Sequence, residues 1–178
     1  PEISAPMVGV EFWNGLGAAA DALNAEQKRI FDQITPNLLS IQSSDDGLYE
    51  TIKMTISWRT PLWFESDAWK ATVRELAGPD AELHFYGGEV AHKGTKSNPL
   101  VRAFLGSIRE VGAKPRFKVK TGTADLNIVG PAWRCPILAY GPGDSKLDHT
   151  PNEHISITEF KESVGILTDV IRRLTSEE

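Results

Sequence analysis

The chain has 178 residues, 40% of them hydrophobic, with a net charge of −5 and a single cysteine. This length suits one large or two small domains, and the acidic balance argues against general nucleic-acid binding, which usually needs a basic excess. One cysteine fits a reducing compartment, and neither a signal peptide nor an apolar run of ~18 residues is evident, so we expect a cytoplasmic protein without a membrane span.

The first half of the chain mixes helical and strand-like patterns. Apolar residues recur at helical spacing near the N-terminus, and they alternate with polar residues from Leu48 onward. In chain order these patterns predict a helix over 5–24, strands over 38–42 and 48–58, a helix capped by Ser66 and ended by Gly78, and a strand over 83–85. This order is most of a ferredoxin-like α/β sandwich, and we expect its remaining strand to precede Pro1.

A polar stretch from Gly87 to Asn98 marks a candidate domain junction. Helical and strand patterns alternate after it, which indicates an α/β layer. The predicted elements are a helix over 100–111, a strand over 117–119, a short helix near 126–129, a buried strand over 136–140 and a final helix over 159–175.

The loop that follows Tyr140 concentrates Asp, His and Glu residues. An imidazole at His149 could bind zinc, with Glu153 as a further ligand or as a supporting partner. A loop histidine that only stabilises local structure is the alternative at this point. A catalytic zinc needs about three protein ligands, so we expect the others outside this chain.

Two further features could recognise a substrate. Thr121, Gly122 and Thr123 follow a predicted strand and precede a predicted helix, where free backbone N–H groups attract carboxylates. Arg59 ends the polar face of its strand and could hold a carboxylate with two hydrogen bonds. A plain turn and a surface ion pair are the respective alternatives.

The stretch from Lys93 to Lys120 contains eight basic residues and one acid, Glu110, which gives it a net charge of +7 within an acidic chain. Such a stretch could steer an acidic partner or substrate, or it could be an ordinary solvated face.

Two long motifs resemble a known family. They are KTGTADLNIVGPAW at 120–133 and CPILAYGPGDSKLDHTPNEHI at 135–155, supported by VEFWN at 10–14 and PLVRAF at 99–104. They are similar to co-catalytic dizinc amidohydrolases and peptidases, which include acetylornithine deacetylase, succinyl-diaminopimelate desuccinylase and glutamate carboxypeptidases. Within this family they most resemble the branch that releases lysine or ornithine from an amino-group carrier protein or from an N-acetyl group.

The resemblance implies a two-part fold. Residues 1–93 would form a lid that is also the dimerisation domain. Residues 94–178 would form the C-terminal segment of an α/β/α zinc-binding catalytic domain, whose N-terminal segment is expected upstream with the remaining ligands and the catalytic glutamate. Two zinc ions, or cobalt, are implied as cofactors.

The resemblance also implies roles for particular residues. His149 corresponds to the metal ligand of the C-terminal segment. Residues 121–123 correspond to the loop that lines the substrate site, Arg59 to an arginine of the lid, and Asp46 lies roughly where relatives have a substrate-facing Asn.

The implied function is a zinc-dependent amidohydrolase in lysine or arginine biosynthesis. It would be a homodimer acting on an amino-acid derivative or on an acidic carrier protein, which the basic stretch could dock. We expect this chain alone to be inactive. The alternatives are a non-catalytic dimerisation or binding module, or a related dizinc carboxypeptidase or deacylase with a different substrate.

Overall fold

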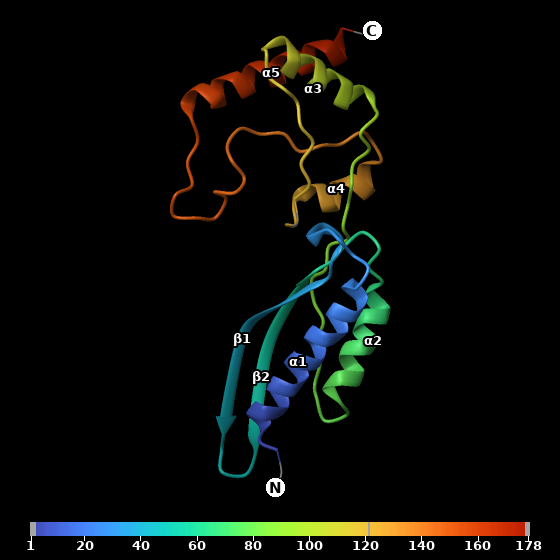
Figure 1. The fold of residues 1–178 in the computed structure, drawn as a ribbon, viewed down its shortest axis with the longest axis vertical. Coiled ribbons are helices and arrows are strands. Elements are labelled where there is room, and N and C mark those ends of the chain that lie inside the picture. The colour runs from blue at the N-terminus through green and yellow to red at the C-terminus, as the bar shows by residue number, and fades with distance from the viewer. Residues whose placement is uncertain (1–2, 121, 177–178) are drawn as a thin grey trace. The chain divides into compact units, whose positions relative to one another are not determined.

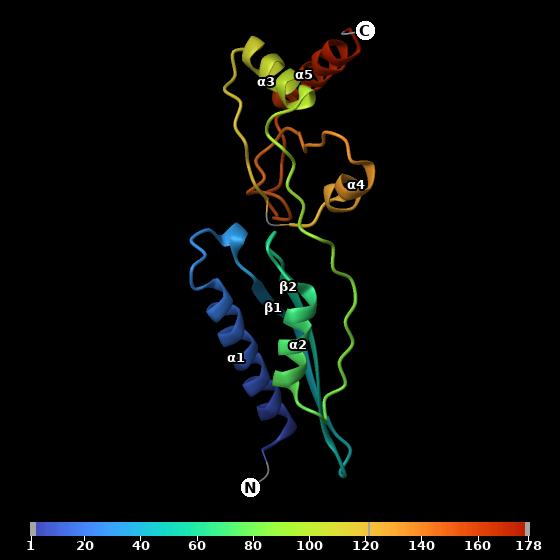
Figure 2. The ribbon, with the colours of Figure 1, turned by 90° about the vertical axis from the view of Figure 1, so that its right-hand side faces the viewer.

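The computed structural model describes residues 3–120 and 122–176, which fold as two compact units. The first unit contains residues 3–91 with 119–120 and 122–123, and the second contains 92–118 and 124–176. Both are drawn in Figure 1, and again at right angles in Figure 2. The predicted mixed α/β class is confirmed, with one two-stranded sheet in the described part of the chain.

An antiparallel hairpin forms the sheet of the first unit. Its strands are β1 (Thr35–Asp45) and β2 (Glu50–Arg59), and their register runs from Thr35 opposite Arg59 to Asp45 opposite Glu50. A register irregularity between Leu38 and Ser40 interrupts the ladder. The predicted hairpin is confirmed, and β1 is longer than expected because polar residues on both sides of 38–42 also pair with β2.

Two helices, α1 (Ala5–Asn24) and α2 (Ser66–Ala77), cover one face of this hairpin (Figures 1 and 2). Helix α1 approaches β2 closely because Gly9 has no side chain, and a Cβ there would overlap the Cδ1 of Ile52. The buried core of the first unit consists of Leu16, Ala20, Ile34, Trp69 and Val73. A short 3₁₀ helix, η1 (Ile30–Asp32), precedes β1.

Two predictions for the first unit are wrong. Helix α2 has Glu65 rather than Ser66 at its N-cap, without a side-chain capping bond, although Gly78 ends it as predicted. Residues 83–85 form no strand, yet Leu83 and Phe85 are half-buried against the core and His84 is exposed. The alternating pattern therefore predicted which side chains face the core, but no strand in the described part of the chain pairs with this segment.

The second unit is helical in its regular parts, with α3 (Pro99–Glu110), α4 (Asp125–Trp133) and α5 (Ile157–Thr175). Helices α3 and α5 pack through a cluster of Ala103, Phe104, Ile166 and Val170. An ion-pair network joins the same two helices, because Arg173 of α5 pairs with Glu110 of α3 and with Asp169.

The predicted strands over 117–119 and 136–140 are wrong, since both segments are irregular. A strand exists only with a ladder partner, and the described residues of the second unit contain no sheet. Helix α4 is longer than the predicted 126–129, and its C-cap residue is Arg134, whose φ of 52° lies in the left-handed region. No helix among the described residues is both long and apolar enough to cross a bilayer.

Candidate functional site

The loop from Gly141 to Ile155 is a succession of hydrogen-bonded turns. The backbone N–H of Leu147 donates to the carbonyl of Asp144 at 2.9 Å, that of Thr150 to Leu147 at 3.0 Å, and that of Glu153 to Thr150 at 3.1 Å. Each turn begins at the residue where the previous turn ends. The loop therefore has a defined backbone conformation although it contains no helix or strand.

His149 is exposed and has a φ of 62°, in the left-handed region that non-glycine residues seldom occupy. Its backbone N–H donates to Oε2 of Glu153 at 2.9 Å. Among the described residues no group hydrogen-bonds its imidazole ring. The loop thus fixes the backbone of His149 and leaves the ring available to a ligand.

A shallow hollow lies beside His149 in the same loop. Its lining residues are Pro142, Gly143, Asp144, Asp148, Glu153, His154 and Ile155. Two further contacts order this wall: Nδ1 of His154 lies 2.7 Å from the carbonyl oxygen of Asn152, and the N–H of Gly143 donates to Oε1 of Glu159 at 3.0 Å. The hollow is therefore polar and rich in carboxylates.

Glu159 also belongs to this region, although the sequence pattern did not indicate it. The hydrogen bond from Gly143 to its carboxylate connects the loop to the start of α5. The pKa of Tyr140 is raised mainly by burial of its hydroxyl, and the negative charge of Glu159 adds to this effect. The detectable signal was Ser156 three residues before Glu159, a common pattern at helix starts. Ser156 does cap α5, because its Oγ accepts the N–H of Glu159 at 3.4 Å.

The described residues include no group of three His, Cys, Asp or Glu side chains that could hold a metal ion. The imidazole of His149 is a donor that suits zinc, but the Glu153 carboxylate is already engaged with the backbone of His149. The described residues therefore do not form a three-ligand metal site among themselves. The assignment of His149 stays a prediction.

Asp46 lies in the turn between β1 and β2. Its Oδ1 accepts the N–H of Leu48 at 2.9 Å and that of Tyr49 at 2.8 Å. The hydrogen bonds from Tyr49 and Leu48 lower the pKa of the Asp46 carboxyl below its ordinary value, since they favour the charged form. The sequence missed this local role, although Asp before Gly in a turn commonly bonds the following backbone.

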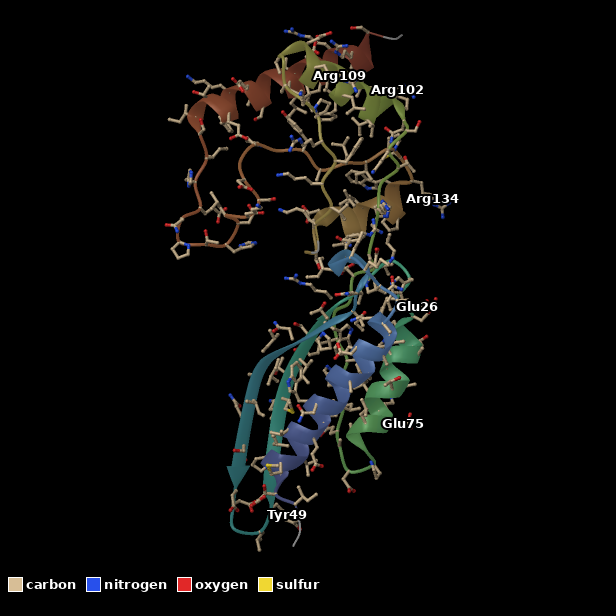
Figure 3. The ribbon with its side chains drawn as sticks, viewed as in Figure 1. Glu26, Tyr49, Glu75, Arg102, Arg109 and Arg134 are labelled. Atoms are coloured by element: carbon tan, nitrogen blue, oxygen red, sulfur yellow. The ribbon has the colours of Figure 1, made fainter. Side chains whose placement is uncertain are left out.

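Arg59 lies at the opposite end of β2 from this turn (Tyr49 marks the turn in Figure 3). A strand of this length separates its ends by roughly 30 Å. Within one copy of the first unit, Asp46 and Arg59 are therefore too far apart to contact the same amino-acid-sized substrate.

The remaining predicted substrate residues are 121–123, which come after α3 in the sequence. Thr121 lies outside the described residues, whereas Gly122 and Thr123 are exposed and belong to the first unit. His149 belongs to the second unit. Their roles in substrate binding stay predictions.

Comparisons with known proteins give one consistent result. A family model described as peptidase family M20/M25/M40 matches residues 5–173. The LysW-lysine hydrolase of Deinococcus radiodurans is 44% identical over 146 residues, which are 82% of this chain and 40% of that relative. A putative LysW-lysine/LysW-ornithine hydrolase of Pyrococcus horikoshii is 55% identical over 84 residues, which are 47% of this chain and 26% of the relative. The chain thus spans less than half the length of these relatives.

Proposed function

The chain belongs to the peptidase family M20/M25/M40, and from this premise we propose that it contributes to a metal-dependent amidohydrolase releasing lysine or ornithine from a carrier protein. The observation that carries the proposal is 44% identity over 82% of this chain to a relative named for hydrolysing LysW-lysine. The name of the Pyrococcus relative includes both lysine and ornithine, so the proposal includes both products. We further propose a role in the biosynthesis of lysine or arginine and a location in the cytoplasm.

The proposed metal is zinc, held in part by His149. When bound, zinc supplies a Lewis acid that polarises the amide carbonyl and activates water. His149 supports this assignment because its exposed ring is free of hydrogen bonds among the described residues and its backbone is fixed by Glu153. The other ligands and the general base would come from residues beyond those described, since no three-donor group occurs among them.

The proposed substrate contacts come from two places in the first unit. Arg59 would bind the carboxylate of the released amino acid, together with backbone or hydroxyl groups of residues 121–123. Asp46 lies at the far end of the hairpin from Arg59. It could therefore share a substrate site only with the Arg59 of another protomer.

We also propose that residues 1–93 act as a lid of ferredoxin-like type through which the protein dimerises. Strand β1 pairs with β2 along one of its edges. Two apolar side chains of β1, Leu39 and Ile41, are 58% and 47% exposed. An exposed apolar edge strand is a surface that proteins usually cover. A second copy would cover it in the proposed homodimer.

The test uses the full-length protein that contains this chain, loaded with zinc. Its kcat/KM is measured with LysW-linked lysine, LysW-linked ornithine and N-acetyl-lysine. We expect turnover of at least one carrier-linked substrate, at a kcat/KM well above that for N-acetyl-lysine. Absence of hydrolysis of all three would contradict the proposal and favour a binding module, and turnover of N-acetyl-lysine alone would favour a deacetylase.

A further inference from the structure

The loop that carries His149 is attached at both of its ends to the same pair of packed helices. At its entrance, the ring centroids of Tyr140 and of Phe104 in α3 lie 4.8 Å apart. At its exit, Ser156 caps α5 through a side-chain hydrogen bond. Because Phe104 belongs to the buried cluster between α3 and α5, both ends of the loop rest on this helix pair.

The side chain of Glu159 joins the two ends of the loop. In a usual capping box, a Glu at this position of a helix turns back to the backbone N–H of the N-cap residue. In α5, Oε1 of Glu159 accepts the N–H of Gly143 at 3.0 Å, from a residue 16 positions earlier in the chain. Gly143 has a φ of 96°, which side chains disfavour, so glycine suits the point where the loop is closed.

A second interaction also places the Glu159 carboxylate at the loop entrance. The pKa of Tyr140 is raised by burial and, as the smaller cause, by the negative charge of Glu159. Tyr140 and Gly143 stand on either side of Gly141 and Pro142 in the sequence. One side chain of α5 therefore acts on two points of the entrance.

The segment closed in this way contains the three turns between Asp144 and Glu153. Each turn shares a residue with the next, and the Glu153 carboxylate accepts the N–H of His149 at 2.9 Å. A compact loop whose ends are held together keeps its internal geometry, whereas an open one samples many conformations. The position of His149 therefore depends on the contact that closes the loop.

We propose that Glu159 is a positioning residue for His149, because its hydrogen bond to Gly143 closes the loop that presents the imidazole. The inference rests on the proposed function, in which His149 binds zinc. Glu159 acts through the loop backbone and is not itself a ligand. Residues that orient metal ligands in this way commonly change metal affinity or activity by about 10- to 100-fold.

The test uses the full-length protein with three separate substitutions in α5. Glu159→Ala removes the acceptor, Glu159→Gln keeps an acceptor oxygen without the charge, and Glu162→Ala changes an exposed residue one turn later as the control. Chelator competition measures the zinc Kd, and kinetics with LysW-linked lysine measure kcat and KM. We expect Glu159→Ala to weaken zinc binding and lower kcat about 10-fold each, with KM within about 2-fold. Glu159→Gln should recover most of both losses, and Glu162→Ala should change neither quantity by more than about 2-fold.

A role in helix stability alone predicts a different result. The charge of Glu159 favours the N-terminus of α5, so Glu159→Gln and Glu159→Ala would then lose equally. Equal losses, or an unchanged zinc Kd in Glu159→Ala, would overturn the inference.

Hydrogen exchange of the zinc-free protein tests the same contact without the metal. The His149 amide should exchange about 10-fold faster in Glu159→Ala than in the unmodified protein, because the open loop protects it less. Equal exchange rates would overturn the inference. If the unmodified protein binds no zinc, the proposed function fails, and the exchange comparison still decides whether Glu159 closes the loop.

Discussion

The carboxylate of Glu153 accepts the backbone N–H of His149, with 2.9 Å between Oε2 and the nitrogen, while His149 occupies the left-handed region at a φ of 62°. A non-glycine residue in this region costs about 1–2 kcal/mol, and the hydrogen bond to a charged acceptor offsets part of that cost. The loop thus holds the proposed metal ligand through its backbone, which leaves the imidazole ring available.

Replacing Glu153 should weaken metal binding without removing a ligand. In the full-length protein we expect Glu153→Ala to reduce zinc affinity roughly 10-fold, because partners that orient a ligand commonly contribute 10- to 100-fold. Glu153→Gln retains a carbonyl acceptor and should lose less. Competition with a zinc chelator measures the dissociation constants, and Glu162→Ala on the exposed face of α5 is the control. Unchanged affinity in Glu153→Ala would show that the ligand does not depend on this contact.

The turn at Asp46 should make unfolding sensitive to acid. Because hydrogen bonds from Tyr49 and Leu48 lower the folded-state pKa of Asp46, its contribution to stability is complete above the unfolded pKa and is lost as pH falls through the folded pKa. The loss should begin below about pH 5. Asp46→Asn keeps an acceptor oxygen without the charge, so urea unfolding should show a weaker pH dependence between pH 7 and pH 3. An identical pH dependence in both proteins would contradict this account.

Gly9 and Gly17 of α1 offer a matched pair of substitutions. A Cβ at Gly9 would overlap Ile52, whereas one at Gly17 would have no atom within 4 Å. We expect Gly9→Ala to lower the free energy of unfolding by about 1–2 kcal/mol, with the flexible Ile52 side chain limiting the cost. Gly17→Ala should raise it by about 0.5–1 kcal/mol through helix propensity. Chemical denaturation of the chain measures both, and equal effects would show that α1 does not pack on β2 as described.

Arg59 should contribute to substrate binding more than to turnover. In the full-length enzyme we expect Arg59→Ala to raise KM about 10-fold, the effect of losing a charge-assisted hydrogen bond to a carboxylate. Arg59→Lys should recover part of the loss, because a lysine keeps the charge without the planar fork. Steady-state kinetics separate KM from kcat. A fall in kcat with an unchanged KM would exclude the assigned role.

Helical spacing predicted the long helices well, because an α-helix satisfies its backbone hydrogen bonds within one segment. The limits of α1 agree with the sequence prediction, and α5 begins only two residues earlier than expected. Strands are harder to predict in this way, because a strand makes its backbone hydrogen bonds with a neighbouring strand. The hairpin of β1 and β2 contains its own partner and was predicted, whereas residues 117–119 and 136–140 have apolar patterns but no strand beside them among the described residues.

The candidate site was predictable only in its residue types. The motif around His149 indicated a metal ligand, but the sequence could not show that Glu153 binds the backbone of His149 rather than a metal. Likewise, the position of Asp46 relative to Arg59 depends on the hairpin register, which places them at opposite ends of β2. Both results come from hydrogen bonding and geometry that residue types alone do not specify.

The most direct test of the proposed function is the zinc content of the full-length protein with His149→Ala, measured by plasma emission spectrometry after dialysis, beside turnover of LysW-linked lysine. His154→Ala is the matched control, because His154 lies five residues further along the same loop and is also exposed. We expect His149→Ala to lose bound zinc and at least 100-fold in kcat/KM, while His154→Ala keeps its zinc. Full zinc content and turnover in His149→Ala would contradict the account.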